Sequence, residues 1–165
     1  MTATATLTTS FVQVVTHFTD KMLMLLGNII RDSGLSMSKF TNDRSILERG
    51  LKTWLASGHL RTVTLEIFKP GTRELIRRWD LEWDKCEAAE IGFWVDVADI
   101  KYHLRKSGVL ASDCPYRFIV DTVPGEPHVD GFSSTTYSDT SGLKQYSIGT
   151  TISGGSYGTR TSYWK

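Results

Sequence analysis

The sequence predicts a single α+β domain in which three helices pack on a mainly antiparallel sheet. Three observations lead to this prediction: a helical apolar stripe fills residues 11–30, alternating strands flank Pro70 and Gly71, and residues 124–165 combine Gly, Ser and Thr with strand-like pieces. With 165 residues, 40% of them hydrophobic, the chain is long enough to bury one core without disulfides or metals.

The first helix has the strongest pattern in the chain. Thr9 or Ser10 can cap its start, and Gly34 lies just past its end. The stripe is wide, which predicts a helix at the centre of the core. Its members are Phe11, Val14, Val15, Phe18, Met22, Leu25, Leu26, Ile29 and Ile30. The piece LSMSKFTN, residues 35–42, is expected to hold a small hairpin.

A second helix is expected to start at Asn42 or Ser45 and to end at Gly58. Ser45 and Glu48 have the spacing of a capping box. The apolar residues of this helix recur at helical intervals, which predicts one buried face. That face consists of Ile46, Leu47, Leu51, Trp54 and Leu55.

A β-hairpin is predicted on both sides of Pro70 and Gly71. Its first strand alternates Val63, Leu65 and Ile67 with polar residues, and its return strand spans residues 73–84. This period of two predicts that the apolar side chains point inward and that the charged ones face water.

Residues 86–95 are ambiguous and are expected to form a loop or a short strand. Asp96 then caps a third helix that ends at Gly108, with Ile100 and Leu104 inward and Lys101, Arg105 and Lys106 outward. The strand in PYRFIVDTVPG is apolar on both faces, so it should be covered by a helix on one side and by another segment on the other. FSSTTYS, KQYSIGTTI and GTRTSYWK read as three further strand-like pieces.

The composition limits the classes of partner. A net charge of +1 provides no field that would attract nucleic acid, and no apolar stretch approaches the length of a membrane span. The N-terminus does not have the pattern of a signal peptide, and Cys86 and Cys114 form no CxxC pair. We therefore expect a cytoplasmic protein without a membrane or direct nucleic-acid site.

Enzymatic motifs are weak. The sequence has no phosphate-binding loop, the four histidines form no metal-ligand pattern, and the thiol of Cys114 is expected to be buried. His17 is expected at the surface or core edge, and His103 in solvent. A small metal-dependent hydrolase remains an alternative because acidic residues gather at Asp80, Glu82, Asp84, Glu87 and Glu90. Their alternation with Leu81 and Trp83 favours a solvated face, so we expect no enzyme, cofactor or metal.

Several motifs, in this order, resemble the HORMA domain. LKTWL (Leu51, Lys52, Trp54, Leu55) and RRWDLEW (Arg78, Trp79) are similar to motifs of the spindle-checkpoint HORMA protein. FWVDVADIKYHL, SDCPYRFIVDT and GTTISGGSYGTRTSYW resemble the bacterial HORMA group that occurs in CBASS anti-phage operons, beside a cGAS-like nucleotidyltransferase and an AAA+ remodeller.

The resemblance implies a HORMA fold with a core at residues 9–123 and a mobile C-terminal safety belt at 124–165. It implies an adaptor that wraps a closure-motif peptide or protein, activates the cGAS-like nucleotidyltransferase and is reset by the AAA+ remodeller. A HORMA adaptor in another pathway, such as DNA repair, remains open.

The resemblance also implies roles for individual residues. The peptide would lie beside Tyr116, Arg117, Phe118, Ile119, Val120, Asp121 and Thr122. The belt would use Tyr146, Ile148, Gly149, Ile152, Gly154, Gly155, Tyr163 and Trp164, with the glycines providing mobility. The edge on which the belt docks would include Leu75, Arg77, Trp79, Leu81 and Trp83. The remodeller would grip the N-terminal handle, which comprises Thr2, Ala3, Thr4, Ala5 and Thr6.

Overall fold

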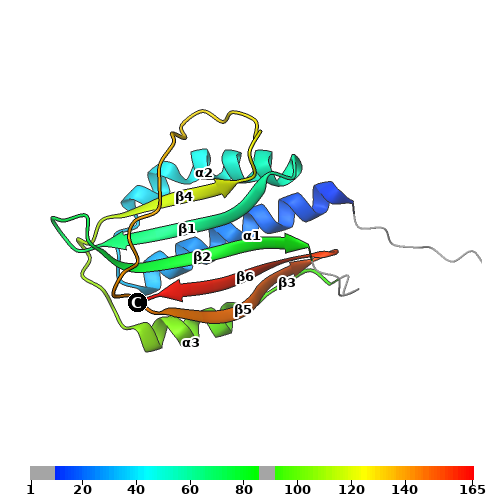
Figure 1. Cartoon of the computed structure of the whole chain (residues 1–165). Helices are drawn as coiled ribbons and strands as arrows, with labels where there is room; N and C mark the ends of the chain where they lie inside the picture. The colour runs from blue at the N-terminus through cyan, green and yellow to red at the C-terminus, as the bar shows by residue number, and fades with distance from the viewer. Residues whose placement is uncertain (1–9, 86–91) are drawn as a thin grey trace, which may run out of the picture.

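The computed structural model describes residues 10–85 and 92–165. Within them the chain forms three helices and six strands, which confirms the predicted α+β class (Figure 1). The helices are α1 (Phe11–Asp32), α2 (Ser38–Ala56) and α3 (Val97–Ser107). The strands are β1 (Leu60–Phe68), β2 (Leu75–Lys85), β3 (Trp94–Val95), β4 (Tyr116–Thr122), β5 (Gln145–Gly154) and β6 (Tyr157–Trp164). None of the described helices has the length and apolarity needed to cross a membrane.

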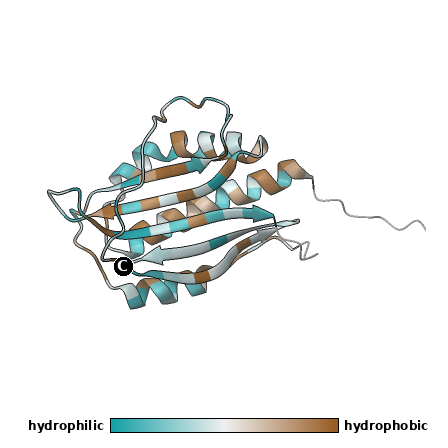
Figure 2. Cartoon of the chain, in the orientation of Figure 1, coloured by the Kyte–Doolittle hydropathy of each residue, from teal (hydrophilic) through white to brown (hydrophobic). Residues whose placement is uncertain are grey.

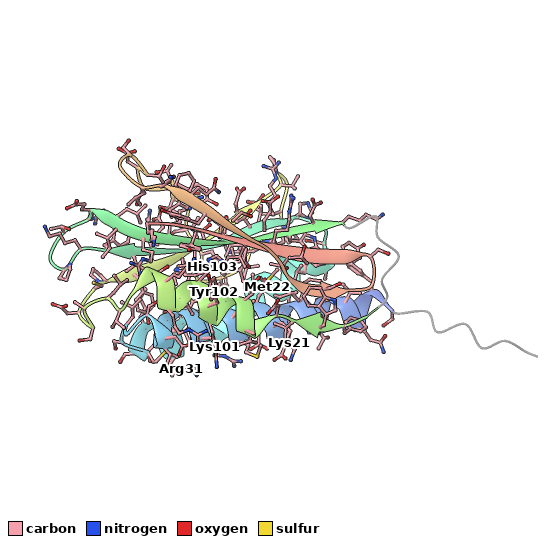
Figure 3. The ribbon with its side chains drawn as sticks, turned by 90° about the horizontal axis from the view of Figure 1, so that it is seen from below. Lys21, Met22, Arg31, Lys101, Tyr102 and His103 are labelled. Carbon is pink, nitrogen blue, oxygen red and sulfur yellow. The ribbon has the colours of Figure 1, made fainter. Side chains whose placement is uncertain are left out.

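The strands form one sheet in the order β3-β5-β6-β2-β1-β4, and every neighbouring pair is antiparallel. The helices lie together on one face of this sheet, and Figure 3 shows α3 beneath it, alongside α1. β4 forms one edge of the sheet. The C-terminal hairpin β5–β6 lies beside β2, so the last residues of the chain sit in the interior of the sheet.

The core lies between α1 and the sheet, as the apolar stripe predicts. Phe18, Leu25 and Ile29 are fully buried. Ser10 is the cap: its hydroxyl accepts from the Gln13 amide, and the Gln13 side chain accepts from the Ser10 amide. Figure 2 shows brown, hydrophobic segments on α1 and β1, whereas β6 is pale because it consists mainly of Thr, Ser, Gly and Tyr.

The hairpin expected in LSMSKFTN is wrong, because α2 already begins at Ser38. Phe40 is buried and its amide donates to the Tyr116 hydroxyl (3.1 Å), so a tertiary contact with β4 stabilises this early turn. Ser45 and Glu48 consequently lie inside the helix and form no capping box. The predicted end at Gly58 is confirmed, where φ is +76°.

The strand expected in FSSTTYS is also wrong. Residues 132–138 have no regular structure, although β5 and β6 form where KQYSIGTTI and GTRTSYWK predict them. The polar groups of this piece bond to side chains of β1 and β4 instead of to a neighbouring strand, as described below.

Candidate functional site

The irregular segment 123–144, called the strap below, connects β4 to β5. In Figure 1 it leaves β4, arches beyond the outer edge of that strand, and then crosses the face of the sheet that carries no helix. It therefore passes from the helix side of the molecule to the opposite side around a free sheet edge. Contacts on both sides hold it in place.

On the helix side the strap is attached to α2. The indole nitrogen of Trp54 donates to the Pro127 carbonyl (2.8 Å), and the Phe132 ring packs edge-on against Trp54 with centroids 4.8 Å apart. Gly50 leaves room for this ring, since a Cβ at that position would lie 2.6 Å from Phe132. The buried face predicted for the second helix thus serves partly as an anchor for the strap.

On the other side the strap is held by a clasp, formed by Glu66, Arg117, Thr135, Thr136 and Ser138. The Glu66 carboxylate is 0% exposed and accepts from the Ser138 amide (2.8 Å), the Ser138 hydroxyl (3.0 Å) and Arg117 Nε (2.7 Å). Arg117 also donates to the Thr135 hydroxyl (3.0 Å) and the Thr136 carbonyl (2.9 Å). A buried carboxylate needs partners of this kind, because losing its hydration without compensation is costly.

A second polar cluster lies next to the clasp. Asp80 is 7% exposed and accepts from the Thr64 hydroxyl (2.6 Å), Arg78 Nε (2.9 Å) and the Trp164 indole (3.2 Å). The Arg78 guanidinium also lies 4.2 Å from the centre of the Tyr137 ring on the strap. Burial raises the pKa of the Tyr137 hydroxyl.

These contacts correct the expectation that the charged face of the hairpin is solvated. Glu66 and Asp80 are buried because the strap and Trp164 cover this part of the sheet. Further along β2 the expectation holds, since Glu82 and Asp84 are exposed and face Arg160 at 3.5 and 3.8 Å. One end of the hairpin is therefore covered, and the other end is exposed to solvent.

A groove lies beneath the strap, along the outer edge of β4. It consists of two cavities of about 400 and 440 Å³, which share Phe118 and residues 132–135 as lining. α2 contributes Trp54 to one cavity and Ile46 to the other. The groove is thus bounded by a strand edge, a helix and the strap.

Most of the residues predicted to bind a peptide line this groove. They are Arg117, Phe118, Ile119, Val120, Asp121 and Thr122. Tyr116 lines neither cavity, because its ring is buried and its hydroxyl donates to the Ser36 carbonyl (2.6 Å) inside the domain. The guanidinium of Arg117 is already engaged in the clasp.

The edge of β4 is open to a further strand. Its inner side pairs with β1, and among residues 10–85 and 92–165 no strand pairs with its outer side. An open edge presents unpaired N–H and C=O groups at the spacing that an extended peptide requires. The expected cover on the second face of β4 is present as well, because Ile119 is buried on the side that the strap crosses.

The hairpin β5–β6 is attached to the sheet more extensively than the strap. β6 pairs with β2 from Arg78↔Trp164 to Lys85↔Tyr157. The Tyr163 ring, 2% exposed, stacks between Trp79 and Tyr146 with centroids 4.6 and 5.2 Å apart.

The end of this hairpin also contacts α3. The Tyr163 hydroxyl lies 3.0 Å from Nδ1 of His103, and Figure 3 shows His103 on the side of α3 that faces the sheet. The expectation that His103 is solvated is therefore wrong. Lys101 lies on the opposite side of α3, as predicted.

The side chains predicted for the docking edge of β2 lie mainly in the core. Leu75, Trp79 and Leu81 are buried and Trp83 is half-buried, while the contact with β6 runs through the backbone of residues 78–85. Arg77 donates to the carbonyls of Ser107 (2.8 Å) and Gly108 (3.1 Å) at the end of α3. Burial lowers the pKa of this guanidinium.

The glycines of the last hairpin fit its docked form. Gly149 has a φ of +105° at a bulge and Gly155 a φ of +60° in the turn, so both need the left-handed region. A Cβ on Gly154 would lie 2.6 Å from the Phe93 ring. Ile152 is fully buried, and the remaining predicted belt residues Tyr146, Ile148 and Trp164 are half-buried.

α1 contacts this hairpin through His17. Its Nε2 lies 2.9 Å from the Ser153 carbonyl, and burial lowers the pKa of the imidazole. The ring is half-buried, which agrees with the predicted position at the core edge. Cys114 is buried, as expected.

The predicted handle, Thr2 to Thr6, lies outside the described residues, as do Cys86, Glu87 and Glu90. Within residues 10–85 and 92–165, no group of three or more His, Cys, Asp or Glu side chains is arranged to hold a metal ion. The oxygens of Asp80 are already bonded to protein donors. The described part of the acidic cluster therefore gives the hydrolase alternative no support.

Sequence patterns do not predict the residues that hold the strap in place, above all Glu66, Phe132, Tyr137 and Ser138. One signal pointed to them indirectly: a strand that is apolar on both faces requires a cover on its second face. Glu66 lies on the strand next to it, within reach of that cover. Because the strap has no regular structure, the spacing of its residues does not predict which residues they contact.

Comparisons with known proteins agree with this architecture. The family model described as Bacterial HORMA domain 2 matches residues 1–165. No curated protein matches the sequence.

Solved structures share the fold at low sequence identity. A chain in the structure of C. elegans HTP-2 bound to the HIM-3 closure motif is 12% identical with a TM-score of 0.73, covering 95% of this chain and 92% of that chain. A chain of the mitotic checkpoint complex is 11% identical with a TM-score of 0.76, covering 92% and 97%. A chain of the E. coli MS115-1 CdnC:HORMA-deltaN complex is 14% identical with a TM-score of 0.61, covering 97% and 91%.

Proposed function

The chain belongs to the bacterial HORMA domain 2 family, and from this premise we propose that it is a signalling adaptor that captures a closure-motif peptide. The observation that carries the proposal is the strap, which passes around the free edge of β4 above two cavities of about 400 and 440 Å³. The HTP-2 structure, which shares the fold, contains a closure motif.

In this proposal the peptide adds a strand to the outer edge of β4. Backbone hydrogen bonds contribute affinity, and the alternating side chains select the sequence. The safety belt, residues 124–165, comprises the strap from Pro124 onward and the hairpin β5–β6. A peptide beneath a closed strap leaves only after the strap has opened, so dissociation is slow and depends on the strap's contacts.

The partners follow from the family. We propose that the loaded adaptor binds and activates a cGAS-like nucleotidyltransferase in the cytoplasm, in CBASS anti-phage signalling, without catalysing a reaction itself. The similar E. coli HORMA chain is in complex with CdnC. An adaptor in another pathway, such as DNA repair, would capture a peptide equally well but would leave the synthase inactive, which an assay of nucleotide second-messenger synthesis distinguishes.

Peptide capture is tested by release kinetics. A peptide selected from a random displayed library on the full chain is labelled, and its dissociation is followed in excess unlabelled peptide. Phe132→Ala removes the ring that holds the strap against Trp54, and release should be at least tenfold faster. Tyr102→Ala, an exposed aromatic residue on α3, is the matched control and should leave release unchanged. Failure of the wild type to retain any peptide contradicts the proposal.

Reset by an AAA+ remodeller is the second part of the proposal. The remodeller is expected to grip residues 2–6, which are small and polar and contain no aromatic anchor. Deleting residues 2–8 should leave folding intact by circular dichroism and should abolish ATP-dependent peptide release. Release at the full rate from the truncated protein would place the handle elsewhere.

A further inference from the structure

Most charges around the groove are neutralised within the protein. Lys39 Nζ lies 2.9 Å from Asp43 on the next turn of α2. Arg117 and Glu66 form the buried pair of the clasp, 2.7 Å apart. The cavity of about 440 Å³, which is lined by Lys39, Asp43 and Arg117, therefore offers an occupant little net charge.

The other cavity is different: two carboxylates line it, and its one histidine, His128, lies 3.0 Å from Asp130. Asp121 reaches it from β4 and Glu126 from the strap, and no lysine or arginine lines it. Among residues 10–85 and 92–165, neither carboxylate forms a salt bridge or a side-chain hydrogen bond. Burial and, to a smaller extent, the Asp121 carboxylate raise the pKa of Tyr137, another residue that lines this cavity, while Thr64 and Arg78 act in the opposite direction.

The position of Asp121 on β4 determines which part of an added strand it meets. Side chains alternate along a strand, so Asp121 shares the strap-covered face with Arg117, while Phe118 and Val120 point towards the helices. A strand added to this edge follows the same alternation. Its helix-side residues meet apolar groups, and its residue opposite Asp121 meets a carboxylate at the short distance typical of cross-strand neighbours.

We propose that the captured segment carries a lysine or arginine whose cation lies between Asp121 on β4 and Glu126 on the strap. The flanking residues on the helix side of the peptide are apolar, to match Phe118 and Phe132. Such a cation neutralises both walls of the groove and joins the strap to the strand edge, so it favours the closed strap. This inference rests on the proposed capture of a peptide.

The test is a selection from a random peptide library displayed on phage, carried out in parallel on three full-length proteins. The wild type should enrich peptides with a basic residue at one fixed position relative to apolar anchors. The double variant Asp121→Asn and Glu126→Gln should keep the anchors and lose the basic preference. Asp113→Asn, an exposed acid that does not line the cavity, is the matched control and should select as the wild type does.

Affinities then measure the effect. Replacing the basic residue of a selected peptide by glutamine should weaken binding to the wild type about tenfold, or about 1.4 kcal/mol. The loss should shrink at high salt and be absent in the double variant. Selected peptides without a basic preference, or an equal loss in the double variant, overturn the inference while peptide capture stands. If the wild type selects no peptide at all, the proposed function fails and the inference fails with it.

Discussion

The two halves of the C-terminal segment are attached to the same domain in different ways. The strap, residues 123–144, contains no helix or strand. Contacts with side chains hold it at a few points: Pro127 and Phe132 contact Trp54 of α2, and Ser138 bonds to Glu66 in the clasp. The hairpin β5–β6 is held by a continuous ladder to β2 and by the buried ring of Tyr163.

This difference indicates that the segment opens in two stages. Lifting the strap breaks contacts at a few points but no strand ladder, so it should occur locally and cost less free energy than detaching the hairpin. Detaching the hairpin breaks the ladder and exposes Trp79 to water. We therefore expect the strap to open more often than the hairpin detaches.

The largest expected effect comes from Tyr163→Ala, which tests the strongly attached half. The ring stacks on Trp79 and Tyr146, and its removal leaves a cavity between strand and helices. We expect a loss of about 3–5 kcal/mol in the free energy of unfolding, measured by urea denaturation. Hydrogen exchange should show the amides of β5 and β6 losing protection before those of β1.

Tyr163→Phe is the matched control for this change. It keeps the stacked ring and removes only the hydroxyl near His103, so its cost should be close to that of one hydrogen bond, about 1 kcal/mol. Equal destabilisation by the two variants would mean that the stack contributes little, and the hairpin would then be no more firmly held than the strap.

The sequence predicts the strongly attached half better than the weakly attached one. The strand-like pieces KQYSIGTTI and GTRTSYWK locate β5 and β6, just as periodic patterns locate α1 and the hairpin β1–β2, because regular elements repeat their burial at fixed intervals. The strap follows no period, and its contacts depend on where Phe132 and Ser138 meet residues distant in sequence. The burial of Glu66 cannot be predicted from the sequence for the same reason. Alternation along β1 predicts that its side chain faces water, but the strap covers it.

A smaller effect, limited to the strap, is expected from Glu66→Ala. The change removes the acceptor of Ser138 and leaves Arg117 without its carboxylate partner. Since Arg117 is partly exposed, we expect about 1–3 kcal/mol rather than the full cost of an unpaired buried charge. Hydrogen exchange at residues 133–138 and the peptide release rate should both increase, while β5 and β6 keep their protection.

Glu82→Ala is the control for this prediction. Glu82 also points away from the helices, but it lies at the solvent-exposed end of β2, where its carboxylate is 3.5 Å from the Arg160 guanidinium. Exposed ion pairs contribute little, so stability and exchange should be almost unchanged. If Glu66→Ala instead released the hairpin together with the strap, the two halves would open as one unit and the proposed two stages would be wrong.

The smallest effect on stability, and the sharpest separation of the two halves, is expected from Gly50→Ala. Alanine favours the helix by up to about 1 kcal/mol over glycine, but its Cβ would lie 2.6 Å from the Phe132 ring and displace it. The melting temperature should therefore change little, whereas peptide release and exchange at residues 131–135 should accelerate. Ser45→Ala, at an exposed site of α2, is the control that stabilises the helix without touching the strap. Unchanged release in Gly50→Ala would show that the strap does not need this contact with α2.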